Sequence, residues 1–291
     1  MRLDRLITLY LARPLLRLRD RLPSSVFRPP SSVLRLPILM YHSISESAEN
    51  GVPAYYRTTT SPAVFRQHMV LLRELGYTGI DLERGLELIG KNQAPGRKYV
   101  VLTFDDGFRD FYTQAVPVLR ELNFTASVFL PTAFIGDQGR SFKGVECLTW
   151  DEARACHRAG MHFGSHTVNH PILADLPWET IEREVKDSKA QIEQELREPV
   201  TCFAHPYAFP QTDTAWVHKL VEVLERAGYL ANVTTGIGRV RAGDNLWLLR
   251  RLPANQCDDS TLLKAKLEGA YDWLHAAQCA IKQIKGLARR L

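Results

Sequence analysis

The segment YVVLTFDDG (Tyr99–Gly107) is an apolar, β-branched run that ends directly in two carboxylates and a glycine. An apolar run without alternation is typical of a parallel strand covered on both faces. Asp105 and Asp106 follow at its carboxyl end, where parallel α/β folds place their functional groups. Two adjacent carboxylates repel each other unless a cation intervenes. We interpret the pair as one metal ligand and one free base, the alternative being an acidic turn in which Gly107 supplies the positive φ.

Outward from this segment, short apolar stretches alternate with stretches of helical periodicity. Repeated β-α units predict an α/β protein with parallel strands inside and helices outside, and this number of units favours a distorted (β/α) barrel of about seven parallel strands. The expected strands are Pro37–Met40, Tyr99–Phe104, Thr125–Leu130, Met161–Gly164, Thr201–Ala204, Tyr229–Val233 and Leu246–Leu249. The expected helices are Ser61–Leu75, Phe111–Leu122, Trp150–Ala159, Leu176–Arg197 and Thr214–Ala227.

A second polar motif, GSHTVNH (Gly164–His170), follows the expected strand Met161–Gly164. His166 and His170 are four residues apart, a spacing that places two imidazoles on one side of a helical turn. Such a pair is also found as ordinary structural histidines. With Asp106, however, it gives three protein ligands and leaves positions open for water, the arrangement of catalytic rather than structural metal sites.

Three motifs occur together in one order: TFDDG (Thr103–Gly107), GSHTVNH (Gly164–His170) and FAHPYA (Phe203–Ala208). As a set they resemble the polysaccharide deacetylase family, the NodB-homology domain, over about residues 37–255. The stretch PILMYHSI (Pro37–Ile44) resembles the subgroup that acts on poly-N-acetylglucosamine-type polymers. The resemblance implies a metal-dependent hydrolase that removes N-acetyl groups from the amino sugars of a polysaccharide or lipid-linked glycan.

The resemblance also implies roles for single residues. Asp105 matches the catalytic base. Asp106, His166 and His170 match the ligands of a divalent metal, Zn²⁺ or a similar ion. Such a metal polarises the acetyl carbonyl and makes a water molecule more acidic.

A third set of roles concerns the substrate groove. Pro206 and Tyr207 match a motif that forms one wall of the groove, where the Tyr207 N–H helps to hold the oxyanion. His205 lies in the same motif, and we expect it to be either a substrate contact or a structural histidine.

The chain departs from the family pattern in three ways, one of which is that Ala208 replaces the usual glycine and is expected to alter the shape of the groove but not the reaction. Ala204 stands where many members carry an arginine that steadies the catalytic aspartate, and Arg251 is the candidate replacement, with a surface charge as the alternative. The late Leu-x-His motif that supplies the general acid is missing. His42, after the first expected strand, is the candidate for that role, with a structural histidine as the alternative.

These departures leave two other functions open. One is a non-catalytic carbohydrate-binding protein on the same fold, which the missing family residues favour and the intact aspartate and histidine pairs oppose. The other is a hydrolase of O-acetyl esters or of other amides, because the same metal site serves all of these reactions.

Charge divides the chain into an acidic body and two basic ends. The net charge is +5, yet residues 1–36 hold eight arginines against two aspartates, and residues 275–291 hold four cations and no acid. An acidic body argues against nucleic-acid binding, whereas basic ends rich in leucine suit an anionic membrane surface.

The sequence divides into three parts. Residues 1–36 are expected to form an amphipathic helix and a Pro/Ser linker, residues 37–258 the catalytic domain, and residues 259–291 one amphipathic helix. For the N-terminal helix, the alternative to membrane contact is docking on the body or on the C-terminal helix. The C-terminal helix could pack on the barrel, pair with a second copy or lie on a membrane.

The N-terminal apolar run Leu6–Ala12 is short for a secretory signal, and no cleavage site follows it. The five cysteines contain no C-x-x-C pair and are expected to be buried free thiols of a reducing compartment. We therefore expect a cytoplasmic protein that rests on the inner face of the membrane.

Overall fold

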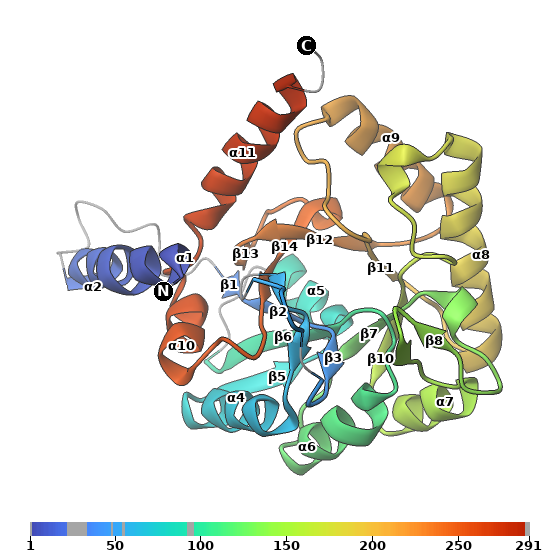
Figure 1. The fold of residues 1–291 in the computed structure, drawn as a ribbon, viewed down its shortest axis with the longest axis horizontal. Coiled ribbons are helices and arrows are strands. Elements are labelled where there is room, and N and C mark those ends of the chain that lie inside the picture. The colour runs from blue at the N-terminus through green and yellow to red at the C-terminus, as the bar shows by residue number, and fades with distance from the viewer. Residues whose placement is uncertain (1, 22–33, 48, 54–55, 92–95, 289–291) are drawn as a thin grey trace.

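The structure, a computed structural model, describes residues 2–21, 34–47, 49–53, 56–91 and 96–288 (Figure 1). Seven parallel strands close into a barrel, which confirms the predicted distorted (β/α) barrel. Around the ring they run β2 (Ile38–Tyr41), β6 (Lys98–Phe104), β7 (Ser127–Leu130), β10 (His162–Ser165), β11 (Cys202–Ala204), β12 (Ala231–Ile237) and β14 (Leu249–Pro253). The ring closes where β14 pairs with β2, Leu252 opposite Leu39. An eighth strand, β5 (Tyr77–Ile80), pairs with the first half of β6.

Helices surround this barrel, as the alternation of the sequence predicts. Their boundaries follow capping chemistry: Ser61 accepts a hydrogen bond from the N–H of Val64, and Thr149 and Glu152 form a capping box. The main outer helices are α4 (Pro62–Glu74), α5 (Leu82–Lys91), α6 (Val116–Glu121), α7 (Trp150–Arg158), α8 (Trp178–Leu196) and α9 (Thr214–Arg226). Their apolar faces and the strands enclose the hydrophobic core.

Two expected elements differ from the structure. Leu246–Leu248 forms a short 3₁₀ turn, because the Asn245 side chain accepts a hydrogen bond from the Trp247 N–H, and the strand follows at Leu249–Pro253. The single helix expected over 259–291 is two helices, α10 (Ser260–Glu268) and α11 (Leu274–Ala288). Gly269 ends α10 with φ +92°, a left-handed conformation that glycine adopts most easily.

Both ends of the described chain pack against the body. The side chains of Leu262, Leu263 and Leu267 on α10 are buried, and Gln278 of α11 donates a hydrogen bond to the carbonyl of Thr235 in β12. These contacts therefore show that the C-terminal segment packs on the barrel, which was one of the alternatives for residues 259–291.

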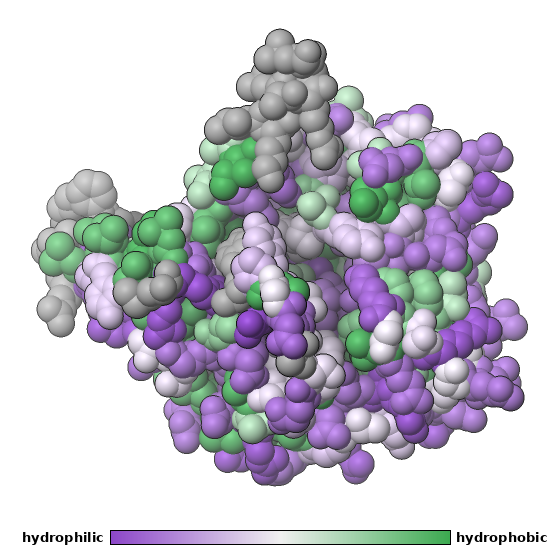
Figure 2. Space-filling view, viewed as in Figure 1, coloured by the Kyte–Doolittle hydropathy of each residue, from purple (hydrophilic) through white to green (hydrophobic). Residues whose placement is uncertain are grey.

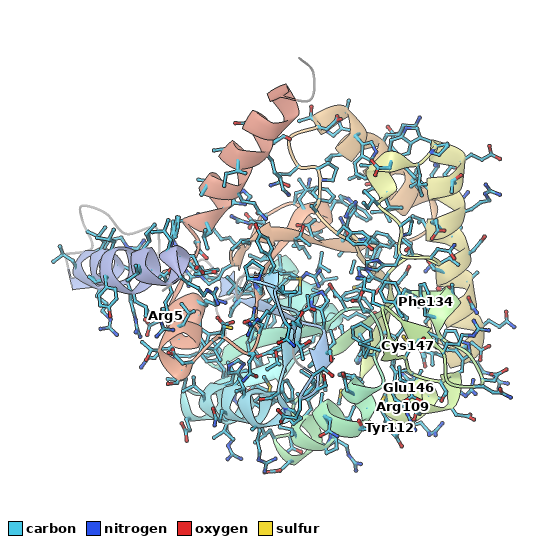
Figure 3. All side chains as sticks on the ribbon, in the orientation of Figure 1. Arg5, Arg109, Tyr112, Phe134, Glu146 and Cys147 are labelled. Carbon is cyan, nitrogen blue, oxygen red and sulfur yellow. The ribbon has the colours of Figure 1, made fainter. Side chains whose placement is uncertain are left out.

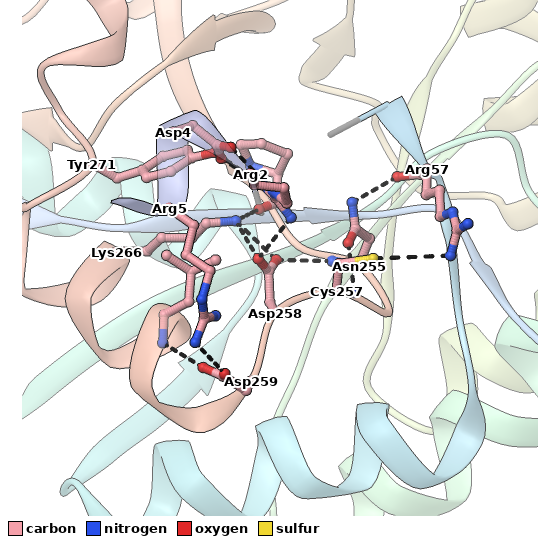
Figure 4. A network of polar contacts seen from close by, with 12 residues as sticks. Arg2, Asp4, Arg5, Arg57, Asn255, Cys257, Asp258, Asp259, Lys266 and Tyr271 are labelled. Carbon is pink, nitrogen blue, oxygen red and sulfur yellow. Dashed lines mark hydrogen bonds and ion pairs between the residues drawn. The ribbon is translucent and has the colours of Figure 1, made fainter. Parts of the chain in front are cut away.

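The N-terminal helix docks on this C-terminal segment through its first residues (Figure 4). It consists of α1 (Leu3–Ile7), a π-helical turn (Thr8–Ala12) and α2 (Arg13–Arg21). Its docking contacts are the hydrogen bonds from Tyr271 to Asp4 (2.6 Å) and from Trp273 to Thr8 (3.2 Å), and the ion pairs Arg5–Asp259 (2.6 Å) and Arg13–Glu268 (2.8 Å). Among the described residues, no helix has both the length and the hydropathy needed to cross a bilayer.

All five cysteines are free. Cys147, Cys156 and Cys202 are buried, and burial raises the pKa of each thiol to about 12. Cys257 and Cys279 are only partly buried, so the expectation of buried thiols is right for three of the five.

Candidate active site

The loop after β6 carries both aspartates into the mouth of the barrel. The N–H of Asp105 donates to the carbonyl of Tyr41, which continues the pairing of β6 with β2. The next two residues adopt positive φ, +71° at Asp106 and +61° at Gly107. A Cβ on Gly107 would lie 2.8 Å from a methyl carbon of Leu130, so glycine is required here for space as well as for φ. The tight turn aims the two neighbouring carboxylates in different directions.

Asp106, His166 and His170 converge on one buried point at this end of the barrel. The Oδ1 atom of Asp106 lies 3.1 Å from Nε2 of His170 and 3.6 Å from Nε2 of His166. One ligand atom from each residue falls within 4.8 Å of the others, and all three side chains are buried. Burial by itself raises the pKa of Asp106, but the close approach of His170 and the charges of the other nearby histidines hold it well below its usual range.

The surroundings of these three residues fit a bound cation. Oδ1 of Asp106 is buried without a hydrogen-bond partner among the described residues, which is costly unless an ion binds there. Nδ1 of His166 lies 2.6 Å from the Ala204 carbonyl, an acceptor that directs the Nε2 lone pair towards Asp106. Burial lowers the pKa of His166 to about 4, so the ring is neutral, as a metal ligand must be. The donor set of one carboxylate and two imidazoles is one that zinc accepts.

A buried glutamate on α8 shapes the histidine loop, and the sequence analysis missed it. Oε2 of Glu184 accepts hydrogen bonds from the N–H groups of Val168 and Asn169, both at 2.8 Å, and Oε1 accepts one from the Asn169 side chain at 2.6 Å. These bonds hold the backbone between the two histidines. The signal was present in the sequence: Glu184 interrupts the apolar stripe that Ile181 and Val185 form on α8.

Arg251 binds Asp105 from inside the barrel. Two parallel hydrogen bonds of 2.7 Å join its guanidinium to the two carboxylate oxygens. Only 1% of Arg251 and 3% of Asp105 is exposed. Burial alone raises the pKa of Asp105, but Arg251 and the nearby His166 hold it below its ordinary value. The Asp105 carboxylate is therefore ionised and fixed in position.

His42 lies at the same end of the barrel, directly after β2. Its Nε2 is 3.9 Å from Oδ2 of Asp105, and its side chain is 18% exposed. The structure thus brings His42, Asp105 and the Asp106 cluster to one place, with solvent reaching the histidine side.

An aromatic wall borders the metal cluster. The ring of Tyr207, in the loop after β11 that also holds Pro206, packs edge-on against His170 with 4.6 Å between ring centroids. Tyr207 is 43% exposed and has φ +54°. The ring of Phe142 lies 4.9 Å from His170 on another side. Lys143 reaches over both aromatic rings, and its Nζ lies 3.7 Å from Oδ2 of Asp106.

Phe142 and Lys143 belong to a hairpin, β8 (Ser141–Phe142) and β9 (Val145–Glu146), that the sequence analysis did not predict. The hairpin is fastened to the aspartate loop by Arg109, whose N–H donates to the Glu146 carbonyl at 2.8 Å. The Arg109 guanidinium also pairs with the Glu146 side chain at 3.1 Å, and Figure 3 shows the two side by side. The strands have two residues each, so no periodic pattern marks them in the sequence.

His205 is placed differently from the other predicted site residues. It is 1% exposed and packs edge-on against Phe209 and Trp216, with centroid distances of 4.9 and 5.7 Å. Neither ring nitrogen has a hydrogen-bond partner among the described residues, and burial lowers the pKa of His205 to about 3. The neutral ring is buried against these two aromatic side chains, and its contact with substrate stays a prediction.

Comparison with known proteins gives the class that this barrel and site define. Residues 92–230 match the family model described as polysaccharide deacetylase, which confirms the family resemblance that the three motifs predict. This range holds the aspartate pair, both histidines and the FAHPYA motif.

Two curated relatives are similar to the chain. The Bacillus subtilis (strain 168) protein named "Putative polysaccharide deacetylase YxkH" is 28% identical over 218 residues, which cover 75% of this chain and 71% of that protein. The poly-beta-1,6-N-acetyl-D-glucosamine N-deacetylase of Escherichia coli (strain K12) is 28% identical over 141 residues, 45% of this chain but only 20% of that protein.

Among solved structures, the Streptococcus pyogenes deacetylase PplD in complex with acetate superposes with a TM-score of 0.70. It is 27% identical in sequence, and the match covers 81% of this chain and 99% of that one. IcaB from Ammonifex degensii has a TM-score of 0.67 at 24% identity, over 80% and 97% of the two chains, and shares the fold.

Proposed function

We propose that the protein is a metal-dependent hydrolase that removes N-acetyl groups from the amino sugars of a polysaccharide or lipid-linked glycan. One observation carries the proposal: an ionised, arginine-bound Asp105 lies directly beside the buried Asp106–His166–His170 group. A metal site with a purely structural role needs no adjacent base. A protein that only binds sugars needs neither the metal site nor the base. The two together support hydrolysis.

The residues divide the reaction between them. Asp106, His166 and His170 would hold a divalent metal, Zn²⁺ by its preference for this donor set, which when bound polarises the acetyl carbonyl and makes a water molecule more acidic. Asp105 accepts a proton from the attacking water, and Arg251 keeps the carboxylate oriented and ionised.

The remaining groups act on the other side of the substrate. The Tyr207 N–H donates to the oxyanion of the tetrahedral intermediate. His42, the partly exposed histidine near Asp105, donates a proton to the leaving amine of the sugar. The aromatic rings of Tyr207 and Phe142 border the cluster and offer a sugar ring apolar surface to pack on.

The substrate class is supported by the relatives and by the exposure of two side chains at the site. Homologous proteins are named for deacetylation of poly-beta-1,6-N-acetyl-D-glucosamine and of chitooligosaccharides. The open side at His42 and Tyr207 suits a chain of sugars rather than an enclosed small molecule.

The test is acetate release from N-acetylglucosamine oligomers by protein that has been stripped with a chelator and reloaded with Zn²⁺. Asp105→Asn is compared with Asp187→Asn, the same chemical change at an exposed position of α8. We expect release that requires metal, persists in Asp187→Asn and falls by at least about a hundredfold in Asp105→Asn.

Two results would contradict the proposal. Saturable binding of the oligomers without acetate release, in protein that holds its metal, identifies a carbohydrate-binding protein. Release from O-acetylated but not from N-acetylated sugars identifies an esterase.

A further inference from the structure

The N-terminal helix has two halves with different surroundings. The first half, α1 and the turn after it, is attached to α10 and to the segment that follows it by the contacts of Figure 4, among them Arg2 to Tyr271 at 3.3 Å. Arg13 at the start of α2 makes a further docking ion pair, with Glu268. Beyond it, α2 projects from the side of the barrel (Figure 1).

The outer side of this helix presents leucines to solvent, both in the turn before Arg13 and in α2. Leu11, Leu15 and Leu18 are 59%, 64% and 59% exposed, and Tyr10 beside them is 70% exposed. The spacing of four and three residues places the three leucines on one face of the helix. Figure 2 shows this apolar surface over α2, where it contrasts with the largely polar surface of the barrel. We call these four residues the leucine face.

A basic groove adjoins the leucine face. It has a volume of about 560 Å³ and lies between the helix and the start of α10, where Thr261 lines it. On the helix side it is lined by Leu9, Tyr10, Pro14 and Leu18 and by two arginines, Arg13, which pairs with Glu268, and Arg17. Arg17 is exposed. Asp4 is one of only two acids among the first 36 residues, and its carboxylate accepts hydrogen bonds from Arg2 and Tyr271. It does not reach the surface of the groove. Apolar side chains and cations therefore lie next to each other on the outer face.

We propose that the leucine face and the basic groove bind the surface of an anionic phospholipid bilayer. An amphipathic helix inserts its apolar side chains at the boundary of headgroups and acyl chains, and its cations pair with the phosphates. A second copy of this chain is the less suitable occupant, because it would bring two strongly basic helices against each other. The docking of the first half keeps the helix in a fixed orientation on the barrel, so that binding needs no rearrangement of the catalytic domain.

The experiment is co-sedimentation of the full chain with two kinds of vesicle, phosphatidylcholine alone and phosphatidylcholine with phosphatidylglycerol. A triple variant, Leu11→Ser/Leu15→Ser/Leu18→Ser, tests the leucine face, and Arg17→Glu tests the groove. Leu230→Ser is the matched control, because Leu230 is 60% exposed and lies in the loop before β12. Circular dichroism and the melting temperature check that each variant is folded.

We expect the wild type and Leu230→Ser to sediment with the anionic vesicles and to dissociate at high salt. Binding should fall at least about tenfold in the triple variant and in Arg17→Glu. Equal sedimentation of the triple variant and the wild type would overturn the proposal, as would binding that does not depend on phosphatidylglycerol. The proposal would also be overturned if the wild type did not sediment with either kind of vesicle and instead formed a dimer through the leucine face. Acetate release from soluble oligomers, measured on the same variants, is expected to stay unchanged, so this result is independent of the proposed activity.

Discussion

Substitution of Arg251 tests how strongly the ion pair between Arg251 and Asp105 stabilises the folded protein. The quantity measured is the coupling free energy between the two side chains. We compare Arg251→Gln, Asp105→Asn and the double variant, each in metal-free protein so that metal binding does not add to the free energy of unfolding. Both side chains are almost fully buried, and the pair is bidentate at 2.7 Å. Each single change therefore leaves one buried group without its partner.

The expected magnitude follows from that burial. Two unit charges about 4 Å apart interact by about 4 kcal/mol at an effective dielectric constant near 20. Breaking a buried pair by removing one partner costs about 3–5 kcal/mol. Arg251 also donates to the Thr234 carbonyl and to Thr103, but these bonds are lost equally in the single and the double variant and cancel in the cycle. We expect a coupling free energy of about 2–3 kcal/mol.

Urea unfolding at constant pH gives the free energy of unfolding of the wild type, the two single variants and the double variant. The matched control is the same cycle on Arg66 and Glu121, a pair joined at 2.6 Å whose side chains are 50% and 51% exposed, where we expect about 1 kcal/mol or less. Free energies that add within about 0.5 kcal/mol at Arg251 and Asp105 would refute the reasoning, because independent groups behave in that way.

Three further changes have defined outcomes. Glu184→Gln replaces one of the two acceptor oxygens with an NH₂ donor and removes the charge, so the two backbone N–H groups and the Asn169 side chain can no longer all be accepted as they are now. Zinc affinity in a chelator competition should therefore fall by about 10–100-fold while the fold persists, and unchanged affinity would contradict the role of Glu184. The hydrogen bond to Glu83 raises the pKa of His162, so its stabilisation is complete below about pH 6.5 and is lost as the pH rises through the higher folded-state value. Because both side chains are partly exposed, His162→Gln should reduce the free energy of unfolding by only about 0.5 kcal/mol at acidic pH and by nothing at about pH 8, whereas an equal loss at both pH values would exclude the linkage. Gly164→Ala would place a Cβ 2.7 Å from the carbonyl oxygen of Cys202, so it should lower the free energy of unfolding by about 1–3 kcal/mol, and a melting temperature equal to that of the wild type would contradict this.

The barrel and most of its site were predictable because the signals are local. Continuous apolar strands, capped helices and polar residues at strand ends all lie within a few residues of one another, as in Tyr99–Gly107. The partner of Asp105 could be predicted only with the help of the family pattern, because Arg251 is 146 residues away in the sequence.

Features that depend on tertiary contacts were not predicted. Glu184 is one charge in a long helix until the histidine loop packs on it, and the hairpin at Phe142 and Lys143 is too short to show a period. The break at Gly269 is hidden by an apolar stripe that continues at helical spacing on both sides of it. The N-terminal helix was ambiguous because a basic, leucine-rich helix suits a protein surface and a membrane equally well, and the structure shows docking for its first half.

Closure of the barrel by its first and last strands sets an order of assembly during synthesis. β2 and β6 leave the ribosome long before β14, and at about 5–20 residues per second Arg251 follows Asp105 by roughly 7 to 30 s. Until then the nascent chain has an open sheet edge and a carboxylate without its counter-ion. A chain released before β14 is complete should therefore be recognised by chaperones and proteases, and no partly active shorter form of the enzyme is expected to accumulate.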